Sequence, residues 1–138
     1  MSPRERFDRL FNRVAAAAGR ADTTEVLRFA PMALGAYAQL DAIDTDARYH
    51  AAVLMIETGQ LDEAAALADT ILAGAPGHLF GFLVRANVAD RRGDAAAGHR
   101  AREAFGRRYE AEIATRKPEY DEHRAALDAF RTTGSSEQ

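Results

Sequence analysis

Histidine and cysteine, the residue types that most often bind metals, do not form a recognisable site in this sequence. No histidine has a second histidine three to five residues away, which is the spacing of a helical metal site. The histidines are His50, His78, His99 and His123. The absence of cysteine excludes thiolate ligands, disulfides and cysteine nucleophiles. We therefore predict no catalytic residue, no metal and no cofactor.

Carboxylates and glycines also lack the spacing that catalysis requires. The glutamates of the C-terminal third do not form the Glu-x-x-His pattern of di-iron bundles. The sequence contains no glycine-rich phosphate loop and no Gly-x-Ser-x-Gly elbow. An enzyme is accordingly a third hypothesis, which requires His78, His123 and carboxylates to meet in a closed pocket.

A basic stripe near the N-terminus is the clearest candidate for contact with an anionic partner. It consists of Arg6, Arg9 and Arg13, which recur at the spacing of one helix face. Guanidinium groups form strong hydrogen bonds with carboxylates and phosphates, so the stripe is suited to an acidic peptide or a phosphate. Glu5 and Asp8 lie close by, and their partial neutralisation of the stripe favours an ordinary solvated face as the alternative.

Nucleic acid is a partner that the sequence argues against. The formal net charge of −3 and the pI near 5.8 provide no global field that would attract it. The densest run of bases comprises Arg100, Arg102, Arg107, Arg108, Arg116 and Lys117. Glutamates are interspersed in this run and stacking aromatics are missing, so we predict no nucleic-acid interface.

Helix start and stop signals follow one another along the whole chain. Ser2, Pro3 and Glu5 form a capping box, and Gly19 provides a permissive stop. No long stretch alternates with period two. We therefore expect an all-α fold of about seven helices, over residues 3–19, 22–40, 45–58, 61–73, 78–92, 94–115 and 118–131.

One proline interrupts this helical pattern. Pro31 lies inside the second expected helix, where it removes a backbone hydrogen bond and clashes with the preceding turn. We predict either a kink near 27–30 or a break into two short helices.

A repeat of 34 residues is the most specific signal. Gly59 and Gly93 are 34 residues apart, as are two pairs of small residues, Ala52 with Ala86 and Ala64 with Gly98. The segment 45–78 also has an acidic lead into its second helix and a closing proline, Asp62-Glu63 and Pro76. On these residues the chain resembles the tetratricopeptide repeat family.

The resemblance implies antiparallel helix–turn–helix repeats in a right-handed superhelix. It implies a single domain over 1–131 made of a divergent hairpin, 3–40, the best repeat, 45–76, a degenerate repeat, 79–115, and a capping helix, 118–131. In the degenerate repeat Phe82 fits the family pattern, whereas Arg85 and Glu110 depart from it. Residues 132–138 have nothing apolar to bury and are expected to be a flexible tail.

The resemblance also implies a concave groove lined by the first helix of each repeat. The residues expected there are Tyr49, Val53, Ile56, Phe80, Leu83, Asn87 and Arg91. Tyr49 and Phe80 are the expected aromatic anchors for a bound peptide or helix. Only Asn87 matches the clamp by which some members hold a terminal carboxylate. The alternative is that the chain fills the groove with one of its own helices.

The resulting expectation is a non-enzymatic adaptor that binds another protein. The alternative is a structural accessory subunit of a larger, possibly membrane-associated complex, and self-association also stays open. No apolar run is long enough to span a membrane, and the N-terminus lacks a secretory signal. The cytoplasm is the default location, with a membrane-attached or exported context left open.

Overall fold

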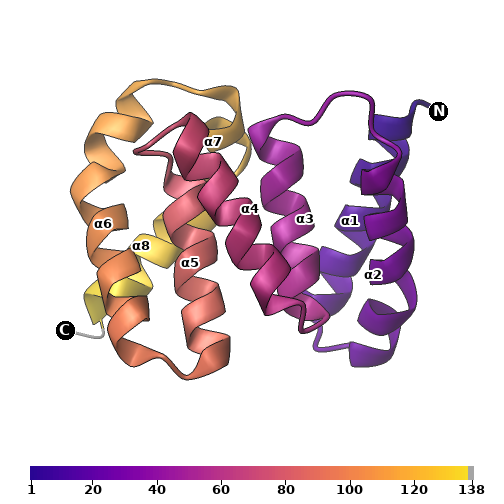
Figure 1. Ribbon diagram of the computed structural model, residues 1–138, viewed down its shortest axis with the longest axis horizontal. Coiled ribbons are helices and arrows are strands. Elements are labelled where there is room, and N and C mark those ends of the chain that lie inside the picture. Colours follow the sequence, from indigo (N-terminus) through magenta and orange to yellow (C-terminus); the bar gives the residue numbers. More distant parts are fainter. Residues whose placement is uncertain (137–138) are drawn as a thin grey trace. The chain divides into compact units, whose positions relative to one another are not determined.

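The computed structural model describes residues 1–136, and all regular structure in that range is helical, which confirms the all-α prediction (Figure 1). The helices of this range are α1 (Pro3–Gly19), α2 (Thr23–Ala38), α3 (Thr45–Glu57), α4 (Leu61–Gly74), α5 (Leu79–Arg92), α6 (Ala95–Ala114), α7 (Pro118–Glu122) and α8 (Arg124–Ser136). Where one domain was expected, the chain divides into two compact units, Met1–Ala64 and Ala65–Gln138. None of the helices formed by residues 1–136 has the length and apolar composition needed to cross a bilayer.

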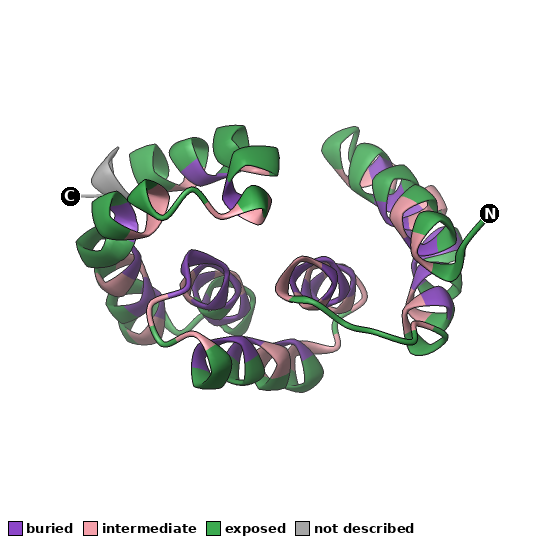
Figure 2. Ribbon diagram, turned by 90° about the horizontal axis from the view of Figure 1, so that it is seen from above, coloured by how far each residue is buried: buried purple, intermediate pink, exposed green. Residues whose placement is uncertain are grey.

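The first unit is built on the antiparallel hairpin of α1 and α2 (Figure 1). Ser2 caps α1 as predicted, because its hydroxyl accepts from the Glu5 N–H at 3.1 Å and Glu5 accepts from the Ser2 N–H at 3.2 Å. The buried face of α1 packs on that of α2, and both helices are purple on one side and green on the other in Figure 2. The core residues of these two faces are Phe7, Phe11, Val14, Ala17, Val26, Phe29, Ala30, Ala33 and Ala36.

Helix α3 packs on this hairpin through Ala47 and Leu54, which belong to the same buried cluster, and through contacts of Arg4 and His50. The guanidinium of Arg4 lies 3.0 Å from Asp44, which caps α3, and 2.8 Å from Asp46 in its first turn. The His50 ring stacks on Phe11 with 3.8 Å between centroids. These contacts tie the start of α1 to the start of α3.

Pro31 does not break α2, so the prediction of two short helices is wrong. One helix runs from Thr23 to Ala38 with Pro31 inside it. Pro31 is exposed, whereas Phe29, Ala30 and Ala33 on either side of it are buried against α1. Burial of both halves on the same partner helix stabilises one continuous helix despite the lost backbone hydrogen bond.

The second unit is built on the antiparallel hairpin of α5 and α6 (Figure 1). Helix α4 packs on α5 at Gly81, where an added Cβ would lie only 2.4 Å from Leu72 Cγ. On the far side of the hairpin, α8 lies against α6 through Phe130, whose ring centroid is 4.8 Å from that of Phe105. Leu127 of α8 is completely buried.

The expected helix over 118–131 is two helices, α7 and α8, which raises the count for residues 1–136 from about seven to eight. His123 separates them, with φ −113° and ψ 21°. Tyr120 is anchored at the start of α5, while Phe130 is anchored on α6. Because Tyr120 is held at α5 and Phe130 at α6, the chain changes direction between them, at His123.

Helix α8 also continues beyond the expected limit of residue 131, as far as Ser136. The hydroxyls of Thr132 and Thr133 donate to the carbonyls of Asp128 and Ala129, at 3.0 Å each. Each hydroxyl thus has a hydrogen-bond partner one turn earlier on the same helix. Glu137 and Gln138 of the expected tail lie outside the described residues.

Left-handed residues end four of the helices. Gly59 has φ 79° and Gly93 has φ 71°, in agreement with their predicted role as stops. The stop after α1 was predicted at Gly19, but Gly19 is helical and Ala21 has φ 56° instead. The N–H of Asp22 donates to Ala17 O at 2.9 Å, and that of Ala21 donates to Ala18 O at 3.0 Å. This Schellman motif forces an alanine into the conformation that glycine prefers.

Ala21→Gly is therefore expected to raise the free energy of unfolding by about 1 kcal/mol, because glycine relieves the left-handed strain. Urea denaturation followed by circular dichroism measures the change. Ala15→Gly, at an exposed position inside α1, is the matched control and should lower stability by about 1 kcal/mol. Equal destabilisation by both substitutions would contradict the assignment of strain to Ala21.

Gly81→Ala is expected to lower the free energy of unfolding by about 1–3 kcal/mol, since the new Cβ collides with Leu72. The same denaturation measurement applies. In a Leu72→Ala background the cost of Gly81→Ala should shrink, because the colliding atoms are gone. Gly106→Ala in α6, where nothing lies within 4 Å, serves as the control and should not destabilise the chain.

Candidate functional site

The groove candidates of the first unit are mostly covered. Tyr49 is 8% exposed and Ile56 is 5% exposed, while Val53 is half-buried against the core of this unit. Burial, with a smaller effect of Asp46, raises the pKa of Tyr49 to about 12. In this conformation the Tyr49 ring is a core side chain and not an accessible anchor.

The groove candidates of the second unit divide into buried and accessible residues. Phe80 and Leu83 are buried, Asn87 is half-buried and Arg91 is exposed. The Phe80 ring packs edge-on against Tyr120 at 5.7 Å and against His123 at 5.5 Å between centroids. Tyr120 and His123 thus cover the Phe80 ring. This agrees with the alternative in which the chain fills the groove with one of its own helices.

His78 is almost completely buried, with 1% of its surface exposed. It caps α5, because its Nδ1 accepts from the Phe80 N–H at 3.1 Å. A ring nitrogen that accepts carries no proton, so the neutral ring bears its proton on Nε2 and donates to Glu119 at 3.0 Å. Sequence analysis did not identify this cap, because histidine is not among the preferred N-cap residues.

Tyr120 completes the same hydrogen-bonded cluster. The N–H of Leu79 donates to the Tyr120 hydroxyl at 3.0 Å, and this hydroxyl donates to Glu112 at 2.6 Å. Burial and then the bond to Glu112 raise the pKa of Tyr120. The cluster joins the start of α5 to α7 and to the end of α6.

The His78 cluster has the residue types of a catalytic site but not its accessibility. His78 meets Glu119, and the Phe80 ring contacts both His78 and His123, so the histidines and a carboxylate of the third hypothesis are near one another. However, both nitrogens of His78 are engaged and the ring is covered. We interpret the cluster as a clasp that holds α7 on α5.

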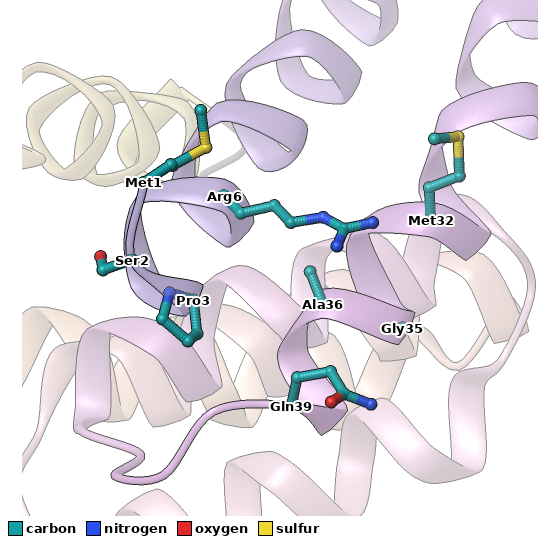
Figure 3. Close-up of a pocket in the computed structure, with 8 residues that line it drawn as sticks. All are labelled: Met1, Ser2, Pro3, Arg6, Met32, Gly35, Ala36 and Gln39. Carbon is teal, nitrogen blue, oxygen red and sulfur yellow. The ribbon is translucent and has the colours of Figure 1, made fainter.

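A cleft in the first unit combines apolar side chains with a predicted site residue, Arg6. It has a volume of about 530 Å³ and lies between the start of α1 and the second half of α2. In Figure 3 the Arg6 side chain extends from α1 toward α2, with its guanidinium between Met32 and Ala36. The residues lining the cleft are Met1, Ser2, Pro3, Arg6, Met32, Gly35, Ala36 and Gln39.

The exposed face of α2 continues this cleft as an apolar surface. Leu27 is 57% exposed and Met32 is 47% exposed, and Met1 of the cleft is 74% exposed. The exposed positions of α2 are Thr23, Thr24, Leu27, Arg28, Pro31, Met32, Gly35 and Ala38. Only Arg28 is charged among them, whereas a solvated helix face is normally rich in charge. We call Leu27, Pro31, Met32 and Gly35 the α2 face.

The basic stripe predicted from the sequence lies beside this surface, and its three arginines differ in their contacts. Arg13 is engaged, since it lies 3.2 Å from Glu25 and its guanidinium covers the Phe29 ring at 3.8 Å. Arg6 and Arg9 are exposed, and neither forms an ion pair with a residue of the described range 1–136. Two of the three predicted cations are thus available to an anionic group.

A second cavity, of about 400 Å³, lies in the second unit among α4, α5 and α6. Phe82 and Arg85 contribute to its lining, as does Asp69. Arg85 is already paired with Asp69 at 2.9 Å. Arg92, Asp94 and Arg100 line this cavity as well, so acids accompany its cations, whereas the lining of the α1–α2 cleft contains Arg6 and no acid.

Several residues of the cleft were not singled out from the sequence, namely Met1, Met32, Gly35, Ala36 and Gln39. The sequence of α2 does contain a signal for this surface. With Leu27, Pro31 and Met32, its apolar residues cover a wider arc of the helix than one buried face requires. The excess did not by itself predict an exposed face, because periodicity alone cannot show which of two apolar faces is covered.

Comparison with protein-family models, with curated proteins and with solved structures gives no match for this chain.

Lowering the pH below 6.5 is expected to destabilise the clasp. Burial lowers the pKa of His78 below its ordinary value of 6.5, although Glu119 opposes this. The unfolded chain therefore takes up a proton at His78 near pH 6.5, whereas the folded chain does so only at lower pH. The contribution of neutral His78 to the free energy of unfolding is therefore fully present above pH 6.5. It is lost as the pH falls toward the pKa of His78 in the folded chain.

His78→Asn keeps a capping side chain but has no titration in this range, so its unfolding free energy should depend less on pH between 7.5 and 5. Chemical denaturation at each pH provides the comparison. The exposed His99, changed to Asn, is the control and should leave the pH dependence as in the parent protein. An unchanged pH dependence in His78→Asn would show that another group controls acid stability.

Proposed function

We propose that this chain is a non-enzymatic interaction module that binds another polypeptide through its first helical hairpin. The observation that carries the proposal is the exposed apolar α2 face beside the Arg6 cleft. The all-α architecture and the resemblance to tetratricopeptide repeats support it, because repeated helical hairpins expose extended faces for binding.

Exposure of the α2 face has an energetic cost that a partner would remove. Apolar surface transferred out of water contributes about 25 cal/mol per Å². Single exposed apolar side chains are ordinary, but Leu27 and Met32 lie on one helix and continue into a cleft. A contiguous surface of this kind is typical of a protein-binding site.

The proposed contact differs in position from the groove expected from the sequence. Four of the groove residues, Tyr49, Ile56, Phe80 and Leu83, are buried, and a partner would have to displace the present packing to reach them. Asn87 and Arg91 are more accessible. We therefore assign the proposed contact to the α2 face and the cleft, which a partner can reach without rearrangement of the hairpin.

A structural accessory subunit is the second candidate, and the same exposed residues favour it. A permanently assembled subunit covers apolar surface that the isolated chain leaves open. The two candidates differ in whether the partner exchanges. An adaptor forms a complex that dissociates on dilution, whereas an accessory subunit co-purifies with its complex throughout.

The combined substitutions Leu27→Asp and Met32→Asp are expected to reduce recovery of the bound partner at least tenfold, because two carboxylates enter the apolar contact. Affinity capture from a native extract with quantitative mass spectrometry measures the recovery. Ala125→Asp with Ala129→Asp, at exposed positions of α8, adds the same charge elsewhere and should not reduce it. Circular dichroism should show the same helix content in both variants, and equal recovery with each would remove the α2 face from the proposal.

A further inference from the structure

We propose that the partner at this surface is an amphipathic helix that carries acidic residues beside its apolar stripe. The inference rests on the proposed function and adds the chemistry of the partner to it. Three observations carry it: the surplus of positive charge around the cleft, the shape of the α2 face, and the like charges that a second copy of this chain would present.

The acidic groups of the hairpin are already engaged within it. Asp8 lies 3.0 Å from Arg4, and Asp22 accepts from the N–H of Glu25 as the cap of α2. Glu25 itself lies 3.2 Å from Arg13 and 2.8 Å from Arg20. The fourth acid of residues 1–40, Glu5, accepts from the Ser2 N–H in the capping box of α1.

The arginines of the hairpin outnumber these acids. Residues 1–40 contain six arginines and four acids, a surplus of two positive charges. Arg6 and Arg9 form no ion pair with any residue of the described range, and Arg6 projects into the cleft (Figure 3). Arg28 adds a further exposed cation at the edge of the α2 face. A carboxylate in the partner would meet the Arg6 guanidinium, which forms no ion pair with any of residues 1–136.

The shape of the surface suits a helix. Leu27, Pro31 and Gly35 are spaced four residues apart and form one ridge of α2, and Met32 lies beside it. Ridges of this spacing pack into the grooves of a second helix. Gly35 and Ala36 carry little or no side chain where they line the cleft, which leaves about 530 Å³ for a bulky apolar side chain next to Arg6. An acidic residue one turn away on the partner would reach the same guanidinium.

A second copy of this chain is less suitable as the occupant. Symmetric pairing through the α2 face would bring Arg6, Arg9 and Arg28 of both copies into the same interface. Like charges across an interface oppose association, and no unengaged acid in residues 1–40 would compensate them. Charge thus favours a partner of different sequence.

The test selects partners from a displayed library of 16-residue helical peptides against the full-length chain. Four positions on one helix face vary among Leu, Ile, Phe and Met, and the four flanking positions vary among Glu, Gln and Lys. Peptides that also bind a Leu27→Gln, Met32→Gln variant, which loses the apolar side chains without a change of charge, are removed. We expect Glu to be enriched at the flanking positions, and random or Lys-rich flanks would overturn the inference.

Affinities of the enriched peptides then test the assigned arginines. Fluorescence anisotropy should show binding of a Glu-flanked peptide weakened about tenfold by Arg6→Glu with Arg9→Glu, and the same variant should gain affinity for the Lys-flanked form. Arg100→Glu with Arg107→Glu, at exposed positions of α6, makes the same change of charge away from the cleft and should alter neither affinity. Equal effects of the two variants would assign the preference to net charge and overturn the inference.

The remaining outcomes separate the inference from the proposed function. If peptides bind at the α2 face irrespective of their charge, the proposed function stands and the acidic partner is wrong. If no peptide is enriched that depends on Leu27 and Met32, both fail. Sedimentation equilibrium of the chain alone tests whether a second copy occupies the surface instead. A dimer that Met32→Asp abolishes would show that it does.

Discussion

The close approach of antiparallel helices is the constraint on which the rest of the structure depends. Alanines fill much of the contact between α1 and α2, and Gly81 brings α4 against α5 with no room for a Cβ. Side chains this small permit close contact, and the large aromatic side chains then fill the spaces above and below it. Because the chains reverse between helices within a few residues, left-handed turn residues such as Ala21 and Gly93 are required, even where the residue is not glycine.

The second unit shows how a burial requirement can remove a site that the sequence suggests. Phe80 had the position of an exposed anchor, but Tyr120 and His123 cover its ring. The covering segment is held by hydrogen bonds that need His78 to be neutral, with one nitrogen accepting and the other donating. A buried polar group must have partners, so the cluster that stabilises α7 also prevents access to His78. Residue types suited to catalysis serve here to join helices.

In the first unit, by contrast, some apolar side chains stay exposed because the core of the unit does not cover them. Phe29, Ala30 and Ala33 face α1, and Leu27 and Met32 remain exposed on the other side of the same helix. Every acid of the hairpin has a hydrogen-bond or ion-pair partner within it, while Arg6 and Arg9 form no ion pair with any of residues 1–136. An apolar face beside uncompensated cations is the combination from which both the binding role and the acidic character of the partner are inferred.

The sequence by itself determined the helical class, most helix ends and the turn positions at Gly59 and Gly93, because capping and left-handed turns depend on hydrogen bonds within a few residues. It also identified Arg6 and Arg9 as accessible cations. It did not reveal that Pro31 lies within one continuous helix, that Ala21 replaces Gly19 as the turn residue, or that residues 118–131 divide at His123. Nor did it separate the covered Phe80 from the exposed Met32. Those outcomes were decided by tertiary structure, since which face of a helix is covered depends on residues far away in the chain that compete to bury it.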